Sequence, residues 1–158
     1  MCQHTIKYVH TNLIAKDWKK LMHFYINVFN CKPNYPERNI SGVWLDDITE
    51  LSGSQITGIH LSLPGYQENG PTLEIFQYQA PNNKQCDLQH LNKPGFGHIA
   101  FHVDDVQMVL KNIIQHDGKA HGKIVHTKYL ELKKELTITY AKDPEGNFIE
   151  LQNWVSLD

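Results

Sequence analysis

The sequence contains no C-x-x-C pair and no long apolar run, and each of these absences excludes some classes of protein. Its three cysteines, Cys2, Cys31 and Cys86, form no C-x-x-C pair. An odd number without that motif fits neither a disulfide framework nor a thiolate zinc site, so we expect reduced thiols. No apolar run approaches the roughly 18 residues that span a bilayer, and the polar start lacks the apolar core of a signal peptide. We therefore expect a soluble, cytoplasmic protein with no membrane partner.

The chain also has no excess of charge of either sign. Its formal net charge is −2 at pH 7, and lysines and arginines do not cluster with aromatic residues. A nucleic-acid partner is therefore not expected, because phosphate contacts require a basic surface. With 158 residues, of which 41% are apolar, the chain suits one ordinary domain, or two small modules that share a core.

An internal repeat is the most informative feature that is present. Residues 10–25, HTNLIAKDWKKLMHFY, are echoed by residues 98–113, HIAFHVDDVQMVLKNI, and each copy opens with a histidine. Each half of the chain then closes with a strand-like segment that carries a glutamate, TLEIF at 72–76 and FIELQ at 148–152. The repeat predicts two structural modules that contribute similar side chains.

In the first half, residues 6–15 are rich in β-branched and apolar residues, which predicts a strand. Asp17 is a candidate N-cap for a helix that ends near Asn30, where Lys32 and Pro33 follow. Turn-forming residues then separate short strand-like runs at 43–48, 56–63 and 72–79. The apolar face of the predicted helix repeats at helical spacing and consists of Trp18, Leu21, Met22, Tyr25, Val28 and Phe29.

The polar segment 80–95 contains two prolines and is predicted to be a linker, after which the same order of elements restarts. Residues 96–103 are predicted to form a strand, and Asp104 or Asp105 to cap the next helix. Strands are expected near 121–127, 136–141 and 147–154, the last two joined by a tight turn over 142–147. The buried face predicted for this helix is formed by Val106, Val109, Leu110, Ile113 and Ile114.

The predicted architecture is therefore α+β, with two βαβββ modules. The first spans about residues 6–79 and the second about residues 96–154, and together they make a single domain over 1–158. If each sheet curls and the two modules pack together, a concave surface results on which the repeated side chains meet.

Four of those side chains suggest a divalent-metal site: His10 and Glu74 from the first module, and His98 and Glu150 from the second. A single glutamate in an apolar strand usually points to solvent, but here it recurs at matching places and is paired each time with a histidine. Two imidazoles and two carboxylates suit Zn, Ni, Co, Mn or Fe(II), whereas Ca and Mg prefer oxygen ligands. The remaining histidines receive no role, and His60 and His102 are interpreted as core residues.

The motifs HTNLIAKDW, PTLEIFQY, GFGHIAFHVDDV and AKDPEGNFIELQNW resemble the vicinal oxygen chelate superfamily, which includes glyoxalase I, extradiol dioxygenases and bleomycin resistance proteins. The resemblance covers about residues 6–154, and the DPEGN turn with the following FIEL is its most specific part. It implies paired βαβββ modules that form an incomplete barrel around a divalent ion, in a homodimer. It also carries the family's metal ligands over to His10, Glu74, His98 and Glu150.

This four-ligand pattern is most similar to that of glyoxalase I. The resemblance then implies a lyase or isomerase acting on a small carbonyl substrate through a metal-chelated enediolate, with Ni, Zn or Co preferred and Fe or Mn as alternatives. Glu150 is assigned as the catalytic base and Glu74 as the second catalytic carboxylate. Glyoxalase I usually has an arginine four residues after its first histidine ligand, where this chain has Ile14; use of glutathione is therefore not implied.

Two other functions stay open. An extradiol-type Fe(II) or Mn(II) dioxygenase would use two histidines and one carboxylate, and the second glutamate argues against it. A drug-binding protein without catalysis, like the bleomycin resistance proteins, generally lacks the metal ligands that are present here.

Overall fold

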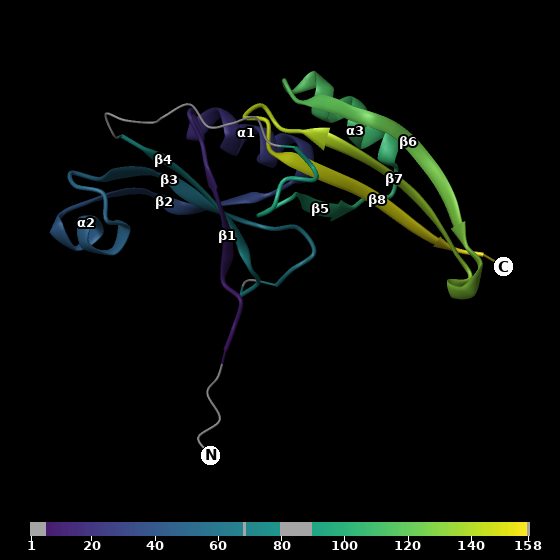
Figure 1. Ribbon diagram of the computed structural model, residues 1–158, viewed down its shortest axis with the longest axis horizontal. Coiled ribbons are helices and arrows are strands. Elements are labelled where there is room, and N and C mark those ends of the chain that lie inside the picture. The colour runs from purple at the N-terminus through teal and green to yellow at the C-terminus, as the bar shows by residue number, and fades with distance from the viewer. Residues whose placement is uncertain (1–5, 68, 80–89, 158) are drawn as a thin grey trace, which may run out of the picture. The chain divides into compact units, whose positions relative to one another are not determined.

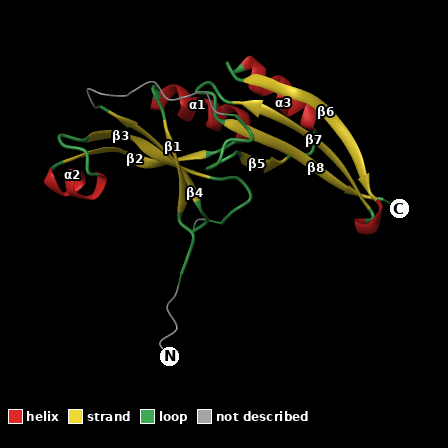
Figure 2. Cartoon of the chain, viewed as in Figure 1, coloured by secondary structure: helices red, strands yellow, loops and turns green. Residues whose placement is uncertain are grey.

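Each half of the chain folds into a four-stranded sheet with a helix packed on it, as the computed structural model shows (Figure 1, Figure 2). The structure describes residues 6–67, 69–79 and 90–157. The chain divides into two units, residues 1–84 and residues 85–158. The fold is therefore α+β, as predicted, and each unit is described separately below.

Unit 1 contains a mixed sheet in the strand order β1-β4-β3-β2. Strand β1 runs parallel to β4, and the other neighbours are antiparallel. Helix α1 packs against β2, β3 and β4. The elements are β1 (His10–Ile14), α1 (Trp18–Phe29), β2 (Lys32–Ser41), α2 (Val43–Thr49), β3 (Gln55–Ser62) and β4 (Thr72–Tyr78).

Unit 2 repeats this topology with the strand order β5-β8-β7-β6. Strand β5 runs parallel to β8, and β8, β7 and β6 are joined antiparallel. Helix α3 packs against β6, β7 and β8. The elements are β5 (Ile99–His102), α3 (Val106–Gln115), β6 (Lys119–Tyr129), a 3-10 turn η1 (Leu130–Leu132), β7 (Lys134–Lys142) and β8 (Phe148–Ser156). The predicted repeat of a βαβββ unit is thus confirmed.

Helix α1 forms where the apolar periodicity predicts it. The Asp17 side chain accepts a hydrogen bond from the backbone N–H of Lys20 at 3.0 Å, which satisfies one of the free donors of the first turn. Asn30 ends the helix in the left-handed conformation, with φ 56°. All six residues of the predicted apolar face are buried, so this face forms the core against the sheet.

Helix α3 is capped in the same way, by Asp105, whose side chain accepts from the N–H of Met108 at 2.8 Å. Val106 and Ile113 are buried as predicted. Ile114, predicted to be buried, is instead exposed. This part of the prediction was wrong because Ile114 lies directly after Ile113, and adjacent residues of a helix point about 100° apart.

The prediction of a strand over 43–48 was also wrong, because this segment forms helix α2. Short apolar runs do not distinguish strand from helix. Tertiary contacts select the helix here: Leu45 is buried, and the Asp46 carboxylate accepts from the N–H groups of Gly53 and Ser54 at 2.8 Å each.

Strand β2 was missed because Pro33 and Pro36 were interpreted as breaking the structure. The strand lies at the edge of the sheet, where a missing N–H donor can face away from the neighbouring strand. Its pairing with β3 is irregular between Asn34 and Arg38, which is where Pro36 lies. An edge position and an irregular register therefore allow two prolines in one strand.

The turn between β7 and β8 follows the prediction. Lys142 pairs with Phe148, and the buried Asp143 carboxylate accepts from the N–H groups of Glu145 and Asn147 at 2.9 Å each. Gly146 takes a positive φ of 92°, which favours glycine.

Two further observations concern the predicted boundaries and membrane contact. Most of the predicted linker, residues 80–89, lies outside the described residues, as do Cys2 and Cys86. Of the helices that the structure describes, none is both long and apolar enough to cross a membrane.

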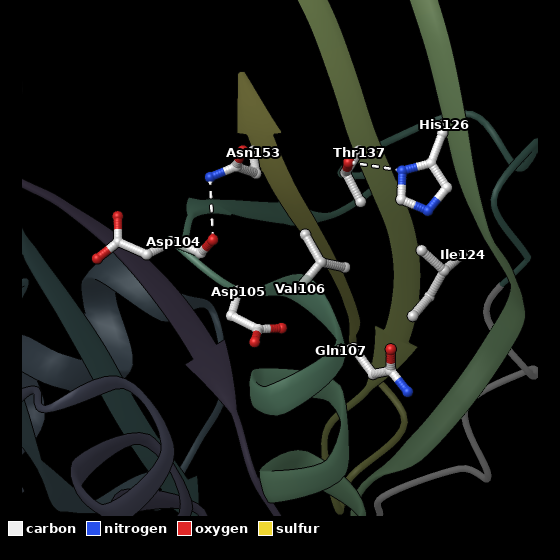
Figure 3. Close-up of a pocket in the computed structure, with 8 residues that line it drawn as sticks. All are labelled: Asp104, Asp105, Val106, Gln107, Ile124, His126, Thr137 and Asn153. Carbon is white, nitrogen blue, oxygen red and sulfur yellow. Dashed lines mark hydrogen bonds between the residues drawn. The ribbon is translucent and has the colours of Figure 1, made fainter. Parts of the chain in front are cut away.

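The two units differ in how they fill the space at the start of their helices. Trp18, the first residue of α1, is buried with 6% of its surface exposed. At the same place in unit 2, directly after the capping aspartate, α3 begins with the smaller Val106. A cavity of 260 Å³ lies there (Figure 3), and its lining includes Val106 with Thr137 of β7 and Asn153 of β8.

We predict that Trp18→Ala lowers the free energy of unfolding by about 3–5 kcal/mol, because it opens a cavity in unit 1 and removes a large apolar contact. Urea denaturation followed by circular dichroism measures this change. Trp44→Ala is the matched control, since Trp44 is 55% exposed on α2, and it is expected to cost less than about 1 kcal/mol. Equal losses in the two variants would contradict the prediction.

Candidate metal centre

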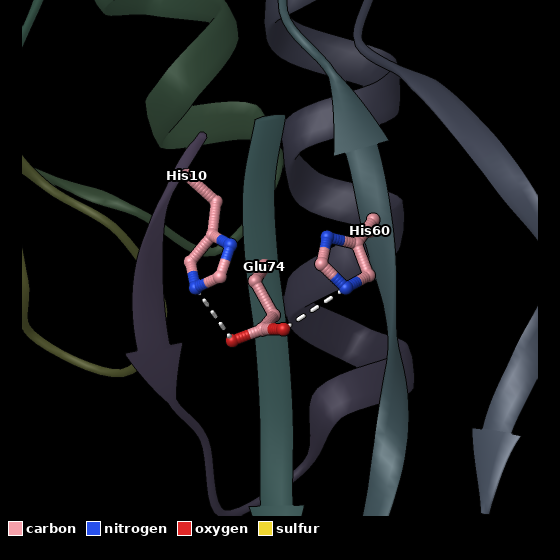
Figure 4. A group of neighbouring side chains, drawn as sticks. All are labelled: His10, His60 and Glu74. Atoms are coloured by element: carbon pink, nitrogen blue, oxygen red, sulfur yellow. Dashed lines mark ion pairs between the residues drawn. The ribbon is translucent and has the colours of Figure 1, made fainter. Parts of the chain in front are cut away.

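Three side chains of unit 1 meet on one face of its sheet. His10 is the first residue of β1, Glu74 lies in the central strand β4, and His60 lies in β3. His60 is directly opposite Glu74 across the antiparallel pair, and Asn12 is opposite Glu74 across the parallel pair. Because side chains alternate along a strand, His10 shares the face of Asn12. Figure 4 shows both rings pointing toward the Glu74 carboxylate.

The contacts within this cluster are close. The Glu74 carboxylate places Oε2 3.5 Å from His10 Nε2 and Oε1 2.9 Å from His60 Nε2. Asn12 Nδ2 also donates to Oε2, at 2.8 Å. Glu74 is 8% exposed although it is charged. Such a buried carboxylate requires partners on its oxygens, and here both oxygens have them.

His60 is in the protonation state that a metal ligand requires. Burial lowers the pKa of His60; the negative charge of Glu74 opposes this effect, while the neighbouring Arg38 and His10 lower the pKa further. The ring is therefore neutral at neutral pH. Its Nδ1 lies 3.1 Å from the Thr72 hydroxyl, a contact that orients the ring and leaves Nε2 facing the cluster.

Unit 2 brings together the other predicted pair. His98, directly before β5, places Nε2 3.5 Å from Glu150 Oε2, the same distance as in unit 1. The Tyr140 hydroxyl donates a hydrogen bond to Glu150 Oε2 at 2.8 Å. Burial raises the pKa of Tyr140, and the hydrogen bond and the charge of Glu150 raise it further. Tyr140 therefore remains a neutral O–H donor at neutral pH.

The chemistry of these donors fits a divalent transition metal. His10, His60 and Glu74 each offer one ligand atom, and these atoms all lie within 4.8 Å of one another. Two imidazoles and one carboxylate suit Zn, Ni, Co, Mn or Fe(II). The residues of unit 1 alone therefore form a possible divalent-metal site, and the identity of the metal stays open.

The sequence located both histidine–glutamate pairs but missed His60. The structure brings His10 to Glu74 and His98 to Glu150, each within its own unit. The combination of all four on one ion stays a prediction. His60 was interpreted as a core histidine because the loop 63–71 between β3 and β4 is too long to fix their register from sequence.

Other reactive groups lie apart from this cluster. Burial raises the pKa of Cys31 to about 12, so this thiol stays protonated and is a poor nucleophile at neutral pH. A cavity of 400 Å³ in unit 1 is lined by the end of α1 and the loop after β3, including Lys32 and Tyr66. Neither this cavity nor the one beside Val106 includes a residue of the metal cluster.

Comparison with known proteins identifies the family and agrees with the fold. Residues 7–151 match the sequence profile of the Glyoxalase/Bleomycin resistance protein/Dioxygenase superfamily, and the chain belongs to this superfamily. No curated protein gives a significant match to the sequence.

Several solved structures share the fold. A glyoxalase family protein from Bacillus cereus aligns with a TM-score of 0.82 and 15% identity, covering 99% of both chains. A point mutant of glyoxalase I from Zea mays gives 0.62 and 22% identity, covering 92% of this chain and 44% of that one. A glutamate-to-glutamine mutant of the fosfomycin resistance protein FosX from Listeria monocytogenes, in complex with Mn(II), gives 0.54 and 18% identity, covering 94% and 92%.

We predict that His60→Ala weakens Co(II) binding by at least about 10-fold, because it removes a candidate ligand nitrogen and the imidazole that contacts Glu74 Oε1. Isothermal titration calorimetry of metal-free protein measures the dissociation constant. His126→Ala is the matched control, since His126 also contacts a threonine hydroxyl, that of Thr137 at 2.9 Å, but lies outside the cluster. Wild-type affinity in His60→Ala would exclude His60 from the site.

Proposed function

We propose that the protein is a divalent-metal-dependent lyase or isomerase that acts on a small carbonyl substrate, in the manner of glyoxalase I. One observation carries the proposal: a histidine and a glutamate approach each other at the same distance, 3.5 Å, in both units of a superfamily member. A histidine–glutamate pair that recurs at equivalent positions in both units is harder to explain as a chance contact than a pair that occurs once.

The proposed ligands are His10 and Glu74 of unit 1 with His98 and Glu150 of unit 2, from one chain or from two. An ion held by them would act as a Lewis acid that stabilises negative charge on neighbouring substrate oxygens. The FosX structure, which contains Mn(II), supports a divalent ion in this fold. Ni, Zn or Co is preferred for the four-ligand set.

Glu150 is the proposed base, and its surroundings support this role. Both oxygens of Glu74 have partners, Asn12 and His60. At Glu150, Tyr140 and His98 both contact Oε2, and among the described residues no hydrogen bond reaches Oε1. Glu150 therefore has an oxygen free to accept a proton from the carbon next to a carbonyl. Glu74 is the proposed second carboxylate: the proton that Glu150 removes would pass to Glu74 by way of the enediolate oxygens, and Glu74 would return it to the adjacent carbon, so that the isomerisation neither gains nor loses a proton.

The proposed substrate is a small carbonyl compound, and its identity stays open. Ile14, at the position where glyoxalase I usually has an arginine, ends β1 and is half exposed. An aliphatic side chain cannot pair with a carboxylate of a glutathione group, so this position does not support the use of glutathione.

A second function is favoured by a specific observation. His10, His60 and Glu74 form a set of two histidines and one carboxylate within one unit. This ligand set is typical of non-haem Fe(II) oxygenases when coordination positions stay open for oxygen and substrate. An extradiol-type dioxygenase that binds Fe(II) or Mn(II) is therefore the alternative to the lyase or isomerase.

We predict that purified wild-type protein contains nearly one equivalent of Ni, Zn or Co, and that His98→Ala and Glu150→Ala each lose most of it. Inductively coupled plasma mass spectrometry measures the metal. Stoichiometric Fe or Mn, with oxygen uptake on a catechol probe, would favour the dioxygenase. No metal after reconstitution would exclude both enzymes and leave a small-molecule binding protein.

We also propose that the protein is a homodimer, as the resemblance implies. Each sheet has two edge strands, β1 and β2 in unit 1 and β5 and β6 in unit 2. Open edges of this kind favour association with a further strand or a second copy of the chain.

Size-exclusion chromatography with light scattering is expected to give twice the 18.3 kDa mass of the chain. The measurement is made at several protein concentrations, because a weak dimer dissociates on dilution. A mass of 18.3 kDa at all concentrations would contradict the dimer and require all ligands to come from one chain.

A further inference from the structure

The residue opposite each ligand glutamate occupies the same place in both units. His60 pairs with Glu74 between β3 and β4, and Tyr140 pairs with Glu150 between β7 and β8. Each of these two residues contacts its glutamate, at 2.9 Å through His60 Nε2 and at 2.8 Å through the Tyr140 hydroxyl. We call this the facing position.

Each facing residue also packs against the histidine of its own unit. The rings of His60 and His10 meet edge to face, with centroids 5.6 Å apart and planes at 78°. The rings of Tyr140 and His98 meet in the same way, at 5.4 Å and 72°. The facing residue therefore contacts both the imidazole and the carboxylate of its unit.

The facing residues differ in what they offer to a metal. His60 offers a ring nitrogen, which is an atom type that binds transition metals. The Tyr140 hydroxyl donates its hydrogen to Glu150. The residue opposite Glu150 on the parallel strand is Ala100, where unit 1 has Asn12, so this position supplies no side-chain donor in unit 2. Tyr140 is thus the one hydrogen-bond donor to Glu150 among the described residues, apart from His98.

We infer that Tyr140 is a positioning residue of the metal centre, which holds Glu150 through its hydroxyl and His98 through its ring. This inference rests on the proposed function, because it requires that His98 and Glu150 bind the ion. Hydrogen bonds from neighbours fix the orientation of ligand side chains, and their loss typically lowers metal affinity by about 10- to 100-fold. With one donor in place of the two at Glu74, Glu150 depends on Tyr140 more than Glu74 depends on either of its own partners.

The test compares Tyr140→Phe, which keeps the ring but removes the hydroxyl, with Tyr140→His, which places at 140 the residue that unit 1 has at 60. Calorimetry and the visible absorption of Co(II) report the binding of the metal alone. Tyr140→Phe is expected to weaken Co(II) binding by about 10- to 100-fold and to change the absorption band. Tyr140→His is expected to restore the affinity to within about 3-fold of wild type, since an imidazole at the facing position contacts the glutamate in unit 1, where His60 Nε2 lies 2.9 Å from Glu74 Oε1.

A double-mutant cycle separates positioning from a general structural effect. In a Glu150→Ala background, Tyr140→Phe is expected to change the affinity by less than about 2-fold, because its effect passes through Glu150. Tyr129→Phe is the matched control, since Tyr129 lies in the same unit and packs on Trp154 through its ring; its affinity is expected to equal that of wild type.

The outcomes separate this inference from the proposed function. Wild-type affinity in Tyr140→Phe, while Glu150→Ala still loses metal, would overturn the role of Tyr140 and leave the metal centre intact. An equal loss from Tyr140→Phe with and without Glu150 would also overturn it, because the hydroxyl would then act elsewhere. If Glu150→Ala kept the affinity of wild type, the four-ligand proposal itself would fail, and the inference with it.

Discussion

The parallel pairing of the first and last strand of each unit is the constraint on which the candidate site depends. In unit 1 this pairing sets His10 opposite Thr72, two residues from Glu74 and on the same face of the sheet. Parallel neighbours cannot be joined by a tight turn and require a long crossover. Helix α1 and strands β2 and β3 provide it, so that residues far apart in the sequence become neighbours. In unit 2, the parallel pairing of β5 with β8 brings His98 to Glu150 in the same way.

The histidine–glutamate distance is the same in the two units, but the two glutamates have different neighbours. Glu74 is held at both oxygens, by an amide and an imidazole, whereas Glu150 is held at one, by a phenol. Moving a carboxylate that has fewer partners costs less free energy, because fewer hydrogen bonds must break. The similar backbones of the two units therefore place two identical side chains in different surroundings. This difference in partners supports the proposal that Glu150, rather than Glu74, is the base.

Much of the fold follows from patterns within short segments, and those were predictable. The cap at Asp17, the apolar face of α1 and the turn around Asp143 each depend on residues within one element. Helix α2 and strand β2 were not predictable, because Leu45 and Asp46 act through tertiary contacts and the two prolines are allowed by the edge position. The local signals in these segments favoured other structures.

The site shows the same limit. His10, Glu74, His98 and Glu150 were selected as candidate ligands because a repeat marks them twice in the sequence, and the structure brings each histidine to its glutamate. His60 and Tyr140 differ in type, so no repeat marked them, and only the register of antiparallel strands reveals that they are equivalent. When a long loop connects two strands, its length does not determine which residues pair. The register of the strands then depends on tertiary contacts.

The difference in length between the units is concentrated in one connection. In unit 1 a seven-residue helix, α2, joins β2 to β3, and in unit 2 the three-residue turn η1 joins β6 to β7. Insertions there leave the pairing of β3 with β4 and of β7 with β8 unchanged, whereas one extra residue within β4 would turn Glu74 to the opposite face. This connection can therefore change in length and sequence, and new surfaces can be acquired, while the strands that carry the proposed ligands stay in register.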